Sequence, residues 1–249
     1  MSSGGLSLVA LGSSFASGPG IRPVVDVGAM RSGVNYPHLL ASALGSQLRD
    51  VTSAGATTAH ILHSRQLTLT GARPPQIEAV TRDATHVTIT IGGNDLGFLA
   101  SVIKVGALGR LGRVRRTTDA DGVALVKVLI TIVDEVRRRA PGARVLLVDY
   151  LTLIGDTPAA DLPFPQRETE EMRRTERRLQ ESTRRAADQS GADLVTVSQT
   201  SRSHGIAAPE PWVAGWELWV PWSGRPLPFH PNTAGMRHIA DEVLTHCRA

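Results

Sequence analysis

The chain has 249 residues, enough for one large α/β domain with a substantial hydrophobic core. Hydrophobic residues make up 41% and charged residues 20%, which excludes wholesale disorder, and a single cysteine, Cys247, excludes an intramolecular disulfide and a CxxC metal site. Lys and Arg outnumber Asp and Glu by 27 to 23, but the arginine-rich segments lack aromatic residues for base stacking, so we expect solvated helix faces and no nucleic-acid partner.

Hydrophobic periodicity and turn residues predict strands that alternate with helices. In chain order we expect a strand at 6–11, a helix at 36–44, a strand at 48–53, helices at 57–64 and 75–82, a strand at 86–91, a helix at 123–139, a strand at 144–150, a helix at 166–190, a strand at 193–197 and a helix at 233–246. This alternation is typical of a parallel sheet covered on both faces. No repeat or linker indicates a second domain, so we expect one domain over residues 1–249.

The sequence shows neither a membrane span nor a signal peptide. No stretch approaches the roughly 18 consecutive apolar residues that a spanning helix needs, and the first residues lack a basic segment followed by a long apolar core. We therefore expect a cytoplasmic protein, or a secreted one if a leader has been removed. The oligomeric state is not indicated.

Chemically useful residues follow the expected strands where each strand ends. Ser14 follows the first strand, Gly55 the second and Asn94 the third, while His230 lies just before the last helix. Ligands of open parallel sheets bind beyond the carboxyl ends of the strands. A serine hydroxyl becomes a good nucleophile when a histidine accepts its proton, and a glycine amide and an asparagine NH₂ stabilise an oxyanion. These residue types therefore indicate an acyl-transfer site.

The segments 12–18, 53–58, 92–95 and 230–232 resemble the four signature blocks of the SGNH hydrolases, also called the GDSL esterase/lipase family, and occur in the family's order. The resemblance implies a three-layer α/β/α sandwich with a five-stranded parallel sheet, of flavodoxin-like architecture. It also implies hydrolysis of carboxylic esters through an acyl-enzyme, without a metal or an organic cofactor.

Position by position, the resemblance implies Ser14 as the nucleophile and His230 as the general base. The backbone N–H of Ser14, the N–H of Gly55 and the side-chain amide of Asn94 would form the oxyanion hole. Small-molecule and lipid esters both fit these roles, so a sugar O-deacetylase and a lysophospholipase or lipase of the same family remain alternatives.

Two positions depart from the family pattern. Ser13 stands where the first block usually has aspartate, and Leu227 stands three residues before His230, where the last block usually has aspartate. A triad cannot be built from that position. We therefore predict a Ser-His dyad in which the backbone carbonyl of Leu227 accepts a hydrogen bond from Nδ1 of His230. The same departures leave open a binding module on a decayed hydrolase scaffold.

All the tryptophans, Trp212, Trp216, Trp219 and Trp222, fall within a short segment before the last helix. Their spacing predicts one face of a helix. That face either packs the segment onto the core or, through Trp216, Trp219, Trp222 and Phe229, lines an apolar substrate pocket.

His60 and His63 lie three residues apart on an expected helix and could share a metal ion. No third ligand accompanies them at a metal-binding spacing. We therefore interpret both as surface or packing residues and expect no metal site.

Overall fold

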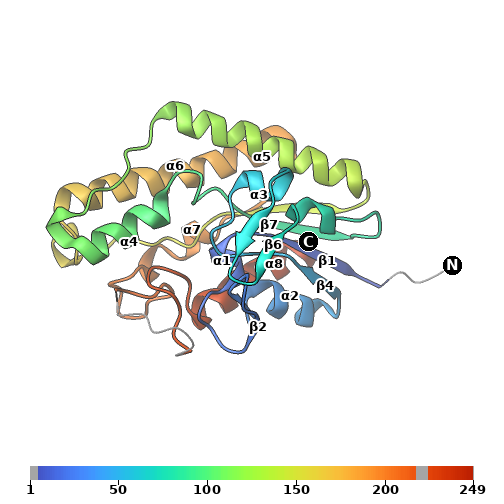
Figure 1. The fold of residues 1–249 in the computed structure, drawn as a ribbon, viewed down its shortest axis with the longest axis horizontal. Coiled ribbons are helices and arrows are strands. Elements are labelled where there is room, and N and C mark those ends of the chain that lie inside the picture. Colours follow the sequence, from blue (N-terminus) through green and yellow to red (C-terminus); the bar gives the residue numbers. More distant parts are fainter. Residues whose placement is uncertain (1–4, 217–223, 249) are drawn as a thin grey trace.

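The computed structural model describes residues 5–216 and 224–248 (Figure 1). Its centre is a five-stranded sheet with the order β4-β1-β7-β8-β9, in which every neighbouring pair is parallel. The strands are β1 (Ser7–Gly12), β4 (Gln47–Asp50), β7 (His86–Thr90), β8 (Arg144–Val148) and β9 (Asp193–Val195). The predicted α/β fold with a five-stranded parallel sheet is confirmed.

Helices cover both faces of this sheet (Figure 1). α5 (Asp119–Arg139) and α6 (Gln166–Ser190) pack together on one face, and α2 (Tyr36–Leu44) and α8 (Thr233–Arg248) pack together on the other. Strands buried on both faces read as continuous apolar runs rather than alternating ones. Every residue of β1, with the sequence SLVALG, is accordingly buried.

Local caps set the ends of the long helices, and α5 begins at Asp119, earlier than the predicted start at 123. The Thr118 hydroxyl accepts a hydrogen bond from the backbone N–H of Asp121 while the Asp121 carboxylate accepts one from Thr118, which forms a capping box at the start of α5. Gly191 adopts a φ of 66° directly after α6, and this left-handed cap ends the helix. Among the described residues, no helix combines the length and apolar character needed to cross a bilayer.

Several short elements were not predicted. Two antiparallel hairpins, β2 (Val24–Asp26) with β3 (Arg31–Ser32) and β5 (Gln66–Thr68) with β6 (Gly71–Arg73), leave the main sheet. Also not predicted are α1 (Ser14–Ser17), α4 (Phe98–Leu108), α7 (Val197–Thr200) and the 3₁₀ turns η2 (Gly109–Leu111), η3 (Ala159–Asp161) and η4 (Arg202–His204). By contrast, α3 (Thr58–Leu62) falls within the helix expected at 57–64, and the 3₁₀ turn η1 (Gln76–Ala79) falls within the one expected at 75–82. The helix expected at 75–82 is therefore wrong beyond the short turn η1.

Candidate active site

Ser14 opens α1 directly after β1, at the carboxyl edge of the sheet. Glycine is needed just before this turn, because a Cβ at Gly12 would lie 2.7 Å from the carbonyl oxygen of Thr90 on β7. Gln76 fixes the same glycine twice: its Oε1 accepts from the Gly12 N–H at 2.7 Å and its Nε2 donates to the Gly12 carbonyl at 3.0 Å. The chain thus holds Ser14 on a rigid turn.

His230 meets Ser14 across the edge of the sheet, with Nε2 at 2.9 Å from the serine Oγ. Both side chains are buried. Phe229, just before the histidine, adopts a φ of 62°, and the chain turns back so that Nδ1 lies 2.8 Å from the carbonyl oxygen of Pro228. An Nδ1–H that donates to this carbonyl leaves Nε2 free to accept the serine proton.

The structure shifts the main partner of Nδ1 of His230 from the predicted Leu227 carbonyl to the Pro228 carbonyl, although the Leu227 carbonyl also raises the pKa of the imidazole. The Leu227 carbonyl accepts a hydrogen bond from the backbone N–H of His230 at 3.1 Å. Leucine at this position still leaves the imidazole without an acidic partner, because no carboxylate among the described residues hydrogen-bonds to it. The geometry is that of a Ser-His pair oriented by the backbone.

The imidazole of His230 is held in its neutral form. Burial lowers its pKa to about 4, and the carbonyls of Pro228 and Leu227 oppose this effect only in part. A neutral imidazole at neutral pH is the state that a general base requires.

The Gly55 and Asn94 loops flank the Ser14 turn, because β4 and β7 are the two neighbours of β1. Gly55 has a φ of 79° in the loop after β4, a conformation that favours glycine. The Asn94 side chain follows β7 and donates through Nδ2 to the carbonyl oxygen of Ala56 at 2.8 Å. One amide hydrogen joins the two loops, and the second remains for another acceptor.

Backbone donors near the serine are also free for another acceptor. Among the described residues, none accepts a hydrogen bond from the N–H of Ser14 or of Gly55. The Gly55 loop and the Asn94 turn are also connected by Asp95, which accepts a hydrogen bond from the Thr58 hydroxyl at 2.6 Å and another from the Thr58 N–H at 3.1 Å. The loops thus present donors that are not used internally.

Tyr150 belongs to the candidate site, although no role was predicted for it. It follows β8 at the same edge, and its hydroxyl lies 3.1 Å from the Oγ of Ser13 and accepts a hydrogen bond from the Gly93 N–H at 3.1 Å. Its ring packs on Phe15 with a centroid separation of 4.7 Å. The hydroxyl connects the Ser14 turn to the Asn94 turn at the position where Ser13 replaces the signature aspartate.

The predicted tryptophan helix is not formed in its described part, since residues 211–216 contain no helix. Trp216 is 42% exposed and stacks on Phe229 with ring centroids 5.7 Å apart. Trp212 lies elsewhere, with its ring 3.6 Å from that of His204. The predicted pocket residues Trp219 and Trp222 lie outside the described residues, so only the contact between Trp216 and Phe229 can be placed.

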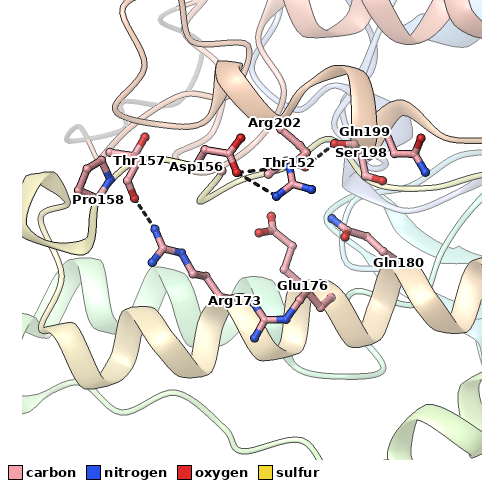
Figure 2. A pocket seen from close by; sticks show the side chains of 12 residues that line it. Thr152, Asp156, Thr157, Pro158, Arg173, Glu176, Gln180, Ser198, Gln199 and Arg202 are labelled. Atoms are coloured by element: carbon pink, nitrogen blue, oxygen red, sulfur yellow. Dashed lines mark hydrogen bonds and ion pairs between the residues drawn. The ribbon is translucent and has the colours of Figure 1, made fainter.

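A cavity of about 370 Å³ opens between α6 and the segment after β8, away from the serine and histidine (Figure 2). Figure 2 shows Glu176 pointing from α6 toward Asp156 and Thr152. The one serine in its wall, Ser198, donates its hydroxyl to the buried carboxylate of Asp149 at 2.5 Å, and no histidine lines the cavity. It therefore lacks a nucleophile paired with a base.

Among the described residues, no group of three or more His, Cys, Asp or Glu side chains lies close enough together to bind a metal ion. His60 has another use: its Nδ1 lies 3.0 Å from the backbone nitrogen of Thr57 and accepts that hydrogen at the start of α3. It completes a helix cap there.

Comparison with known proteins points to one family. Residues 10–238 match the model described as the GDSL-like Lipase/Acylhydrolase family. Lipase 2 of Streptomyces coelicolor is 32% identical over 269 residues, which cover 96% of this chain and 85% of that protein.

Solved structures with the same fold include two from Streptomyces. Phospholipase A1 from Streptomyces albidoflavus NA297 superposes with a TM-score of 0.74 at 21% identity and covers 98% of this chain and 100% of that one. The extracellular lipase of Streptomyces rimosus gives a TM-score of 0.70 at 22% identity, with the same coverage of 98% and 100%.

Proposed function

Since the chain belongs to the GDSL-like lipase/acylhydrolase (SGNH hydrolase) family of carboxylic ester hydrolases, we propose that it cleaves lipid esters with a Ser14–His230 dyad. The observation that carries this proposal is the 2.9 Å contact between Ser14 Oγ and His230 Nε2. It is supported by the unused donors on the neighbouring loops.

In the first half-reaction, Ser14 Oγ attacks the ester carbonyl carbon while its proton passes to Nε2 of His230. The carbonyl oxygen gains the negative charge, and the N–H groups of Ser14 and Gly55 with the Asn94 amide donate to it. When the tetrahedral intermediate collapses, the bond to the alcohol breaks and His230 returns the proton to the departing oxygen. An acyl-serine remains.

In the second half-reaction, water takes the place of the alcohol. His230 accepts a proton from the water as its oxygen attacks the acyl carbon, and the same oxyanion donors stabilise the second intermediate. Collapse breaks the bond to Ser14, which recovers its proton from Nε2. The acid leaves, and neither a metal nor an organic cofactor takes part in these steps.

The choice of a lipid ester rests on the relatives. Two are named as lipases and one as a phospholipase A1, and each alignment covers at least 96% of this chain. A short-chain or sugar acetate ester is the alternative within the family. The paired serine and histidine argue against a decayed scaffold, because a binding module has no need of a base at hydrogen-bond distance from a buried serine.

Ser14→Ala tests the nucleophile. We expect it to abolish hydrolysis of a soluble aryl butyrate and labelling by a fluorophosphonate, with the circular dichroism spectrum unchanged. Ser17→Ala is the matched control, since this buried serine lies on the same short helix and its hydroxyl has no hydrogen-bond partner in the described structure. Turnover by the Ser14 variant would reject the assignment.

A substrate panel then separates the ester classes. Emulsified triacylglycerol, phosphatidylcholine vesicles, an acetylated sugar and the aryl butyrate are compared by kcat/KM. We expect the lipid esters to be preferred, and a preference for the acetylated sugar would contradict the proposed substrate class.

A further inference from the structure

Exposed apolar side chains occur on the two hairpins that are bonded to the loop carrying Gly55. Leu67 and Leu69, on and just after β5, are 83% and 79% exposed, and Val25 and Val27 on the neighbouring hairpin segment are 55% and 43% exposed. We call these four residues the hairpin patch. Large side chains with this exposure are unusual when they occur together, and such patches mark interaction surfaces.

The two hairpins that carry this patch are in contact and are anchored to the oxyanion loop. Arg73 of β6 forms an ion pair with Asp26 of β2 at 2.8 Å. The backbone N–H of Ala54 donates to the Ala29 carbonyl at 2.9 Å, while Gln66 donates through Nε2 to the Ala54 carbonyl at 2.7 Å. Ala54 directly precedes Gly55, so the hairpin patch is attached to the loop that carries the proposed oxyanion donor.

A second apolar group lies toward the histidine side of the site. Leu108 at the end of α4, Leu111 in η2 and Trp216 are 49%, 82% and 42% exposed, and we call them the helix patch. Trp216 stacks on Phe229, the residue before His230. A Cβ at Gly106 would lie 2.6 Å from the Trp216 ring, so α4 packs directly on this aromatic pair.

Cationic side chains border both patches. Residues 51–77 and residues 96–118 contain no Asp or Glu, and Asp26, which lies within the hairpin patch, is ion-paired with Arg31 and Arg73. Arg65 beside the hairpin patch and Lys104 beside the helix patch are exposed, and neither forms an ion pair with another described residue. An apolar surface bordered by cations is the pattern that binds the interface of an anionic lipid layer.

We propose that the hairpin patch and the helix patch together form a docking face for an anionic lipid surface, which brings a lipid ester to Ser14. The inference rests on the proposed function, because the ester that reaches the serine must belong to the docked surface. Seven of the nine exposed large hydrophobic side chains of the described residues belong to the two patches, and the remaining two are Leu6 and Val123.

Binding is measured with Ser14→Ala, so that hydrolysis cannot consume the vesicles. We expect this protein to sediment with vesicles of phosphatidylcholine and phosphatidylglycerol, and more strongly as the phosphatidylglycerol content rises. Adding Leu67→Ser and Leu69→Ser should weaken partition at least about tenfold, because two leucine side chains no longer enter the interface. Val123→Ser, a change of the same kind at a 41% exposed site on α5 outside both patches, is the control and should keep the partition unchanged.

The proposal would be overturned if the leucine double variant and its parent partitioned equally onto vesicles. It would also be overturned if partition of the parent did not increase with the phosphatidylglycerol content. Loss of a dimer in the double variant by analytical ultracentrifugation, with no vesicle binding by the parent, would show that the face joins two copies and would also overturn it. In otherwise wild-type enzyme, the ratio of the rate on vesicle-borne ester to the rate on soluble ester should fall about tenfold with the double substitution. Failure of the wild type on soluble ester would reject the proposed function instead, and the two failures are therefore distinguishable.

Discussion

The Tyr150 hydroxyl joins two turns that take part in the proposed reaction, so Tyr150→Phe removes that link while it keeps the ring. The hydroxyl lies 3.1 Å from the Ser13 Oγ and accepts the Gly93 N–H at 3.1 Å. The ring fills the space beside Gly93, where a Cβ would come within 3.0 Å of it. Phenylalanine therefore creates no cavity, and the change isolates two hydrogen bonds.

The expected loss of stability follows from the Gly93 N–H, which is buried and loses its acceptor. An unsatisfied buried donor costs about 1–3 kcal/mol, so the free energy of unfolding should fall by about that amount. The rate should also fall, because Gly93 precedes Asn94. Complete removal of an oxyanion donor costs about 10²–10³ in kcat. Here Asn94 stays bonded to Ala56, so we expect a smaller loss, about 5- to 20-fold in kcat with little change in KM.

Tyr36→Phe is the matched control, because the chain contains only two tyrosines and burial raises the pKa of each to about 12. The Tyr36 hydroxyl lies 2.9 Å from the Thr90 Oγ1 and touches neither catalytic turn. Urea unfolding and aryl butyrate kinetics of both variants give the comparison. Tyr36→Phe should lose stability without losing kcat, and an equal loss of kcat in both variants, or none in Tyr150→Phe, would refute a positioning role for Tyr150.

Three further predictions concern protons. Because burial lowers the pKa of His230 to about 4, kcat/KM on a soluble ester should hold its neutral-pH value down to about pH 5, and an acid limb with an inflection near 6.5 would contradict this. Leu227→Asp should move that limb to higher pH, since a nearby carboxylate stabilises the imidazolium, and an unmoved limb in the pH-rate profile would show that the carboxylate does not reach the ring. Burial raises the pKa of Glu176 from 4.5 to about 7, so the native state keeps a proton that the unfolded chain loses, and this stabilisation disappears as the pH rises through about 7. Glu176→Gln should therefore reduce the fall in unfolding free energy between about pH 5 and 8 by up to about 3 kcal/mol, and equal slopes in urea titrations would disprove the assignment.

The long elements could be predicted because burial on both faces leaves a strong signal in the sequence. Residues 86–91 alternate Val and Ile with Thr, and the structure forms β7 at His86–Thr90. The β5–β6 hairpin gives no such signal. Each of its strands has three residues, and Leu67 points to solvent while Gln66 is buried, so neither a helical nor a strand period can be recognised.

α4 was missed for a related reason. Its sequence FLASVIKVGAL is apolar around most of the helix and contains Gly106, which is a poor helix former. Phe98 and Val105 are buried while Lys104 is exposed, so the apolar pattern is not a clear stripe. The role of Gly106 is seen only in the structure, where it allows α4 to pack closely against Trp216 and Phe229.

The candidate site could be predicted as far as the order of strand ends allows. That order places the Ser14, Gly55 and Asn94 loops on adjacent strands. The sequence could not show which backbone carbonyl would lie closest to Nδ1 of His230. The position of the Pro228 carbonyl relative to the ring depends on the left-handed φ of Phe229. Dihedral angles of a single residue leave no periodic signal in the sequence.

Tyr150 was missed although its position at a strand end placed it at the same edge. A tyrosine that ends a Val- and Leu-rich strand is indistinguishable, from sequence alone, from an ordinary core residue. Its role depends on Ser13, because the Tyr150 hydroxyl lies 3.1 Å from the Ser13 Oγ and also accepts the Gly93 N–H.

A dyad oriented by a carbonyl has a consequence for the range of conditions in which the enzyme works. A carboxylate at Nδ1 would stabilise the imidazolium with a full negative charge, whereas the Pro228 carbonyl offers only a dipole. The imidazole is consequently a weaker base, and proton transfer from Ser14 is less favourable at neutral pH. In exchange, the base stays unprotonated at acidic pH, where a carboxylate-assisted histidine would already be charged and inactive. If His230 acts as proposed, we therefore expect the departure at Leu227 to favour activity over a broad acid range at the expense of the highest rate at neutral pH.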